Sequence, residues 1–339
     1  MSDSTPDISA AAVPRRGPSF MRRELLALAL IVLTATMPLW PIANSYTLAV
    51  VVRALLFIAL GQAWNVTAGI GGQLSLGHGI FFGLGAYATA ILFNRWGIPP
   101  WLGFLAGMAL ATFVAFVMGA ATFRLRGIYF ALATIAVSLG FLEVTQYYSD
   151  FTGGDSGMAV RFLGESWWAL QSRSPVPFLW LMLAVVVGFY ALSRWLLQSR
   201  LGLELQAVRD DQDAAAAAGI DVVGTKLKGF LLSAAMTAFV GAAYVQFYLA
   251  IDPSTAFGLT EAIQIQLPAL IGGLGTAGGP IIGGAIMIFV SELTNWAGTR
   301  IGQEGIDVLA YGVLLLVMVT RAPEGMIGRL FGLGGGRGA

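Results

Sequence analysis

Apolar runs long enough to span a bilayer recur along this chain, separated by short segments that hold most of the charged residues. A spanning α-helix needs about 20 predominantly apolar residues. On that criterion, helices are expected at residues 25–42, 47–68, 78–94, 100–122, 128–148, 178–197, 227–250 and 305–320. The pattern therefore predicts an all-α, polytopic integral membrane protein.

One further apolar segment, residues 262–295, is too long and too rich in glycine for a single plain span. Two shorter helices that meet at a turn fit it better. Counting both, we expect about ten transmembrane helices.

Glycine is frequent between Gly69 and Tyr87, inside an apolar run from Ala54 to Asn94 that has no charged residue. Glycine weakens helices, so a helix break is expected here. Non-helical backbone at membrane depth is tolerated only against protein or a water-filled cavity, which makes the break a candidate path or gate. The alternative is that Gly79, Gly83 and Gly85 only allow neighbouring helices to approach closely.

An internal repeat links this stretch to the second glycine-rich segment. Six positions recur at an offset of 201 residues: Ile70, Gly71, Gly72, Gly77, Ile80 and Gly83 match Ile271, Gly272, Gly273, Gly278, Ile281 and Gly284. Paired interruptions of this kind predict two inverted-repeat halves around a transport path, with the first copy toward the inside and the second toward the outside. Chance self-alignment of glycine-rich text is the alternative.

The positions of Lys and Arg predict the orientation, because short cytoplasmic loops carry an excess of both. The basic residues expected inside are Arg15, Arg16, Arg22, Arg23, Arg124, Arg126, Arg194, Arg200, Arg209, Lys226, Lys228, Arg321 and Arg329. Loop 149–177 then falls outside, and both termini are cytoplasmic. We expect a disordered cytoplasmic tail over residues 1–20, one membrane domain over 21–330, and a flexible glycine-rich tail over 331–339.

Composition excludes several classes of protein. Of 339 residues, 57% are hydrophobic and 11% charged, against roughly 25% charged in soluble domains. With no Cys and a single His, no zinc cluster or thiol nucleophile is expected, and no phosphate-binding Gly-x-x-x-x-Gly-Lys-Ser/Thr motif is present, so we expect no enzyme. His78 is expected to cap the third helix. The basic residues form no stripe for nucleic acid.

The longest inside loop, residues 198–226, has the text of one or two short amphipathic helices. Leu203, Ala207 and Val208 supply an apolar face, an alanine run follows, and Gly219 is a plausible helix stop. Such a helix can dock in a groove of a peripheral protein, whereas a solvated connector would need no apolar face.

Polar residues inside predicted spans are candidates for a path, since they are costly in lipid. These residues are Gln62, Asn65, Gln73, Glu143, Glu261, Gln264 and Gln266; Arg53 and Asp307 are equally compatible with positions near the interfaces.

Several of these motifs resemble one known family. Gly72-Gln73-Leu74-Ser75-Leu76-Gly77-His78, followed by Phe82 and Gly85-Ala86-Tyr87, resembles the signature of the permeases of branched-chain amino acid ABC importers, in particular the LivM-type subunit. Loop 198–226 is similar to the coupling segment of that family, although Glu204 stands where a basic residue is common.

The resemblance implies a non-enzymatic permease subunit of an ATP-driven importer in the bacterial inner membrane, with no cofactor of its own. The implied partners are membrane lipid, a second homologous permease in a heterodimer, two cytoplasmic ATPases that bind the ATP, and a periplasmic amino-acid-binding protein. The substrate is left open between branched-chain amino acids and urea, amides or other small solutes. An ion-coupled secondary transporter is the alternative, because it also uses inverted repeats and broken helices.

Two sets of site residues follow. The predicted path or gate comprises Gly72, Gln73, Ser75, Gly77, His78, Glu143, Gln264, Gly273 and Gly278. The predicted ATPase-coupling residues are Glu204, Ala207, Arg209, Asp210, Asp211, Ala215 and Gly219.

Overall fold

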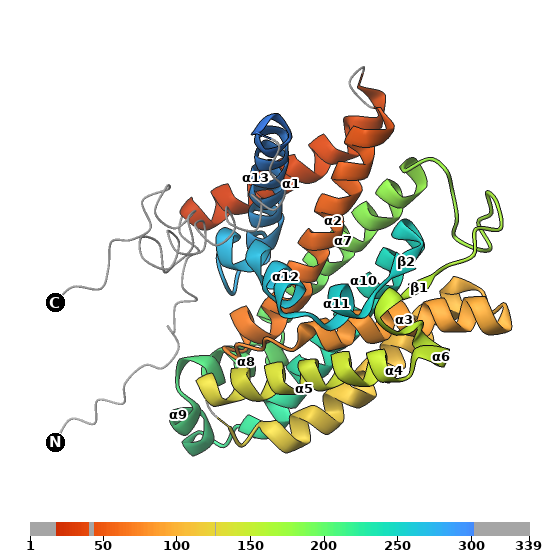
Figure 1. Cartoon of the computed structure of the whole chain (residues 1–339). Coiled ribbons are helices and arrows are strands. Elements are labelled where there is room, and N and C mark those ends of the chain that lie inside the picture. The colour runs from red at the N-terminus through yellow and green to blue at the C-terminus, as the bar shows by residue number, and fades with distance from the viewer. Residues whose placement is uncertain (1–17, 41–43, 126, 302–339) are drawn as a thin grey trace, which may run out of the picture.

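A computed structural model of the chain describes residues 18–40, 44–125 and 127–301, and in this part the structure is almost entirely helical (Figure 1). The longer helices are α1 (Pro18–Thr36), α2 (Ser45–Asn65), α3 (His78–Trp96), α4 (Pro100–Thr122), α5 (Ile128–Tyr147), α7 (Val176–Gln198), α8 (Arg200–Asp210), α10 (Val222–Tyr248), α12 (Leu259–Gly272) and α13 (Gly279–Ile301). The short elements are η2 (Met37–Leu39), the π-helical turn η3 (Val66–Ile70), α6 (Ser149–Thr152), η4 (Gly154–Ser156), β1 (Met158–Ala159), α9 (Gln212–Ala217), β2 (Ala250–Ile251) and α11 (Pro253–Phe257).

Five helical segments of the described part are long and apolar enough to cross a membrane. They are Ser45–Ile70, Pro100–Thr122, Ile128–Tyr147, Val176–Gln198 and Val222–Tyr248. Large apolar side chains such as Phe113 and Val117 on α4 and Leu132 and Leu139 on α5 lie exposed on the outer surface, as lipid-facing residues do. The protein is polytopic, and the total of ten spans stays a prediction.

Most helix boundaries agree with the expected ones, and α4 occupies the expected residues 100–122. Residues 262–295 form two helices, α12 and α13, although α13 is longer than expected. Helix α1 begins at Pro18, inside the predicted tail, because proline fits the first turn of a helix, where its missing N–H has no partner in any case. Residues 1–17, the helix expected at 305–320 and the tail 331–339 lie outside the described residues.

Glycines hold the centre of the molecule together at helix crossings. A Cβ atom on Gly85 of α3 would lie 2.0 Å from the carbonyl oxygen of Ala238 on α10, and one on Gly241 would lie 2.0 Å from the carbonyl oxygen of Phe82. A Cβ atom on Gly107 of α4 would come within 2.9 Å of the Gly85 Cα atom. Close packing is thus the role of Gly85, and of Gly83, against which Phe257 lies.

The described part has two chemically distinct ends. At one end, which we call the β end, β1 pairs antiparallel with β2, and the Asn94 amide at the end of α3 donates to the carbonyl oxygen of Ala159 (2.8 Å). At the other, the α8 end, α8 and α9 pack against α10, and α8 also contacts η3 and α7 (Figure 1). Arg194 pairs there with Glu24 of α1 at 2.6 Å, which places the start of α1 at the α8 end.

Candidate functional site at two helix breaks

The glycine-rich stretch after α2 is a helix break, as predicted. Helix α2 loosens into the π-helical turn η3, residues 71–77 are not helical, and α3 begins at His78. Gly72 has φ +69°, a left-handed conformation that favours glycine. The break is therefore built by Gly72 and its neighbours, whereas Gly83 and Gly85 belong to helix packing.

Side chains from α2, from α5 and from the break itself form hydrogen bonds with the backbone of this first break. The Trp64 indole of α2 donates to the Ser75 carbonyl oxygen (2.8 Å), and the Leu76 amide donates to Thr134 Oγ1 on α5 (3.1 Å). The Gly77 amide donates to Ser75 Oγ (3.3 Å). Because protein groups replace the missing helical hydrogen bonds, the break can persist inside an apolar environment.

The second break, residues 273–278, lies directly beside the first. Gly273 has φ +107° and ends α12. The Asn65 side chain at the end of α2 donates to the Thr276 carbonyl oxygen (2.9 Å) and accepts from the Gly275 amide (2.9 Å). The expectation that the two copies lie on opposite sides is wrong, because these two bonds hold both breaks at one level. An inverted arrangement of the two halves as a whole stays a prediction.

His78 does not cap α3, contrary to expectation. Its ring reaches α10, where Nε2 lies 2.8 Å from Ser233 Oγ, and that hydroxyl donates in turn to the Ala63 carbonyl oxygen (2.6 Å). Since Ser233 uses its only proton on Ala63, His78 Nε2 carries the proton of this pair. His78 also makes edge-to-face contacts with Phe81 and Phe230. Together these contacts form a buried packing interface between the first break and α10.

Loop 198–226 folds into two short helices, α8 and α9, followed by Gly219 with φ +84° as the predicted stop. The face of α8 that packs inward is formed by Gly202, Leu205 and Val208, not by Leu203 and Ala207 with Val208. Leu203 is instead 59% exposed. The inward residues recur every three positions, as on one side of a helix.

The predicted coupling residues divide into inward and outward groups. Ala215 is buried, Glu204 pairs with Arg200 (2.8 Å), and Asp211 caps α9 by accepting from the amides of Asp213 and Ala214. Asp210 and Gly219 remain at the surface, whereas Arg209 reaches the first break. Apart from Arg209, the exposed residues of this segment form what we call the α8–α9 surface: Arg200, Leu203, Asp210, Asp211, Asp213, Ala214, Ala216, Ala217, Ala218 and Gly219.

The structure does not bring every predicted path residue to the breaks. Gly72, Gln73, Ser75, Gly77, His78, Gly273 and Gly278 lie in the two breaks or at their edges. Glu143 is exposed on α5, about 20 Å along the helix from its first residue at 1.5 Å per residue. Gln264 is half-buried in the first half of α12, two turns before the second break.

Sequence reasoning missed the residues that join the breaks to their surroundings. Asn65 stood out as a polar residue within a span, but its partners are 210 and 211 residues away. Trp64 and Ser233 carried no signal, because apolar helices commonly contain such residues.

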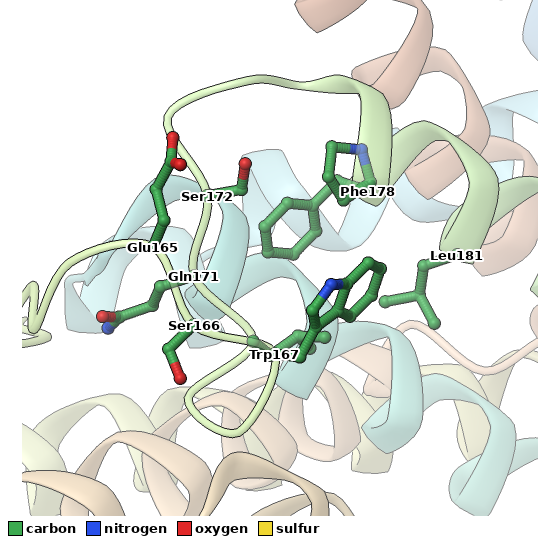
Figure 2. Close-up of a pocket in the computed structure, with 9 residues that line it drawn as sticks. Glu165, Ser166, Trp167, Gln171, Ser172, Phe178 and Leu181 are labelled. Carbon is green, nitrogen blue, oxygen red and sulfur yellow. The ribbon is translucent and has the colours of Figure 1, made fainter.

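A separate cavity of about 290 Å³ lies at the β end, between the loop before α7 and the start of that helix (Figure 2). Trp167 and Phe178 line it together with Gln171, and Glu165 lies at its rim. The Ser166 and Gln171 backbones pair with each other and close the loop. This cavity contains no predicted site residue and lies at the opposite end from the breaks.

The part of the chain that is similar to known proteins contains both helix breaks. Over residues 45–319 the chain matches the family described as branched-chain amino acid transport system / permease component. It is 28% identical over 337 residues to the high-affinity branched-chain amino acid transport system permease protein LivM of Salmonella typhimurium, covering 91% of this chain and 76% of that protein.

Two further relatives extend the comparison. The permease protein LivH of Escherichia coli is 27% identical over 286 residues, covering 80% of this chain and 90% of that protein. A probable LivM of Methanocaldococcus jannaschii is 24% identical over 292 residues, covering 79% and 84%. No solved structure matches the chain. Because the family match extends over most of the sequence and includes both breaks and the α8–α9 surface, the chain belongs to the family of branched-chain amino acid transport permease components.

Proposed function

We propose that this chain is the LivM-type permease subunit of an ATP-driven importer for branched-chain amino acids or related small solutes. The family match over residues 45–319 carries the proposal. The subunit forms part of the translocation path and performs no chemistry on the solute. It works in the inner membrane, with its termini and the α8 end in the cytoplasm.

The partners follow from the same proposal. A second, LivH-like permease pairs with this chain, two cytoplasmic ATPases bind the α8–α9 surface, and a periplasmic protein delivers the solute at the β end. Three observations support this arrangement: the α8–α9 surface is exposed, it presents Leu203 outward, and it lies next to the helix breaks.

The two breaks are proposed as the gate. Their backbone is already non-helical, so rotation about a few dihedrals there costs less than bending an intact helix. Gly72 and Gly273 have positive φ angles that glycine adopts easily. Glycine at these positions leaves the backbone of the breaks free to change conformation. Movement of α8 would then open or close the path at the level of Asn65.

The test is reconstitution of the full-length chain with its candidate permease, ATPase and binding-protein partners in proteoliposomes. Uptake of labelled leucine that requires ATP and the binding protein is expected. Uptake driven by a proton or sodium gradient without ATP would instead establish the alternative, an ion-coupled secondary transporter. Competition by urea and short amides identifies the solute class.

A further inference from the structure

Arg209 at the end of α8 points inward, unlike the other arginine of that helix. Its side chain is 37% exposed, whereas the side chain of Arg200 is 93% exposed. Arg209 Nη1 donates to the Gly69 carbonyl oxygen at 3.1 Å. Gly69 lies in the last helical turn before the first break, where carbonyl oxygens lose their helical partners and attract a cation.

The same side chain lies against both breaks. A Cβ atom on Gly72 would come within 2.4 Å of Arg209 Cγ, and a Cβ atom on Gly275 would lie 2.9 Å from Arg209 Nη1. Glycine at both positions therefore leaves the space that the arginine occupies. Asn65, at the end of α2 and one π-helical turn before the first break, is also hydrogen-bonded to Gly275 and Thr276 of the second break.

Asp210 orients the guanidinium. Its Oδ1 accepts from both Nε and Nη2 of Arg209, at 3.1 Å each, which leaves Nη1 for Gly69. A planar guanidinium can serve both partners at once, whereas a lysine ammonium on a flexible stem cannot reproduce that geometry. An apolar contact also links α8 to the first break: Leu205 of α8 packs between Gly71 and Gly229.

We propose that Arg209 is a positioning residue that holds both helix breaks to α8, so that a displacement of α8 moves the two breaks as one unit. The inference rests on the proposed function, which assigns the driving ATPases to the α8–α9 surface. It changes the expected role of Arg209 from contact with the ATPase to transmission within the permease.

The first experiment measures the breaks directly. Since the chain has no cysteine, spin labels can be placed on L74C and L274C, whose parental side chains are 52% and 39% exposed on the first and second breaks. In the full-length protein in nanodiscs, Arg209→Ala should broaden the distance distribution between the two labels. Arg209→Lys should broaden it partly, and Arg200→Ala on the same helix is the matched control that should leave it unchanged.

The second experiment measures transmission in the reconstituted complex. Arg209→Ala should keep ATPase copurification and ATP hydrolysis but lower uptake about tenfold or more, within the usual range of coupling effects. Lys228→Ala, which removes an exposed charge from α10 outside the α8–α9 surface, should keep parental uptake. A distribution in Arg209→Ala as narrow as in the parent overturns the inference, and so does parental uptake by that variant. Failure of the parental chain to retain an ATPase overturns the proposed function, and the label distances still decide whether Arg209 holds the breaks.

Discussion

Individual glycines in this protein differ in whether they need to be glycine, and replacement by alanine distinguishes them. Gly72 combines φ +69° with a neighbour, Arg209, that leaves no space for a side chain. Gly140 on α5 is helical and has no atom within 4 Å of a Cβ position. The cost of a side chain therefore depends on the backbone conformation and on the space around it.

We expect Gly72→Ala to destabilise the protein by about 1–2 kcal/mol, the cost of a left-handed conformation for an L-residue, and to impair uptake. Gly140→Ala should be neutral or stabilise the helix by up to about 1 kcal/mol. Denaturant unfolding of the two purified variants measures both effects. If the two variants were equally stable, the positive φ at position 72 would not require glycine.

Asp252 provides a pH-dependent contact at the β end. Partial burial raises the pKa of Asp252, but hydrogen bonds from Ser254 and Thr255 outweigh burial and hold the pKa below its ordinary value. The carboxylate caps α11, accepting from the Thr255 amide at 2.8 Å and from Thr255 Oγ1 at 2.7 Å. Because the pKa is lower in the folded state, the ionised carboxylate stabilises the fold at pH values above the ordinary aspartate pKa. This stabilisation is lost as the pH falls through the pKa of the folded state.

Asp252→Ala should therefore lower stability by about 1 kcal/mol at pH 7, as loss of a helix cap does. The difference from the parent should shrink below about pH 4, the ordinary range of an aspartate. Melting temperatures of parent and variant across this pH range test it, with the exposed Glu165 replaced by alanine as the control. A difference that stays constant with pH would contradict the role of the charge.

At the scale of an element, α8 and α9 present one face to the membrane domain and another outward. Leu203 is 59% exposed, while Ala215, which the sequence suggested as a docking residue, is 5% exposed and packs within the chain. A charge at Ala215 would thus disturb folding. The exposed leucine is the better probe of docking.

Leu203→Asp should weaken retention of the ATPases at least about tenfold, equivalent to about 1.4 kcal/mol, without changing the stability of the permease alone. Trp167→Asp, which replaces another exposed apolar residue at the β end (73% exposed), is the matched control. Copurification at graded salt concentration, together with a melting curve, measures both properties. Equal retention by both variants would exclude docking through Leu203.

For the whole molecule, the described part predicts which surfaces face the same compartment. Arg194, Arg200, Arg209 and Lys226 gather with α8 and α9, and the start of α1 is tied to Arg194. Short loops rich in Lys and Arg stay in the cytoplasm. The α8 end is therefore expected inside and the β end outside.

Single cysteines at Trp167 and Ala217 test this orientation, since both positions are exposed and the chain has no other cysteine. A membrane-impermeant maleimide added to spheroplasts should label W167C at once, and A217C only after permeabilisation. Labelling of both cysteines from the same side would be incompatible with the proposed topology.

The sequence alone was enough for the helices and for the position of the breaks. Spans such as 100–122 and the non-helical residues 71–77 depend on local properties: the length of an apolar run and the weakness of glycine in a helix. The family resemblance rests on the same local motifs.

Only the tertiary structure decided how these local features meet. It placed the two breaks side by side rather than on opposite sides, joined them through Asn65, turned Arg209 inward and moved Glu143 away from the site. The offset of 201 residues shows that two segments are alike, but it carries no information about their distance. That distance is set by packing between helices far apart in the chain, above all α2 against α12 and α13, where Gly61 lies against Pro268 and Gly284 against Ile58. Such contacts depend on shape rather than on any local pattern.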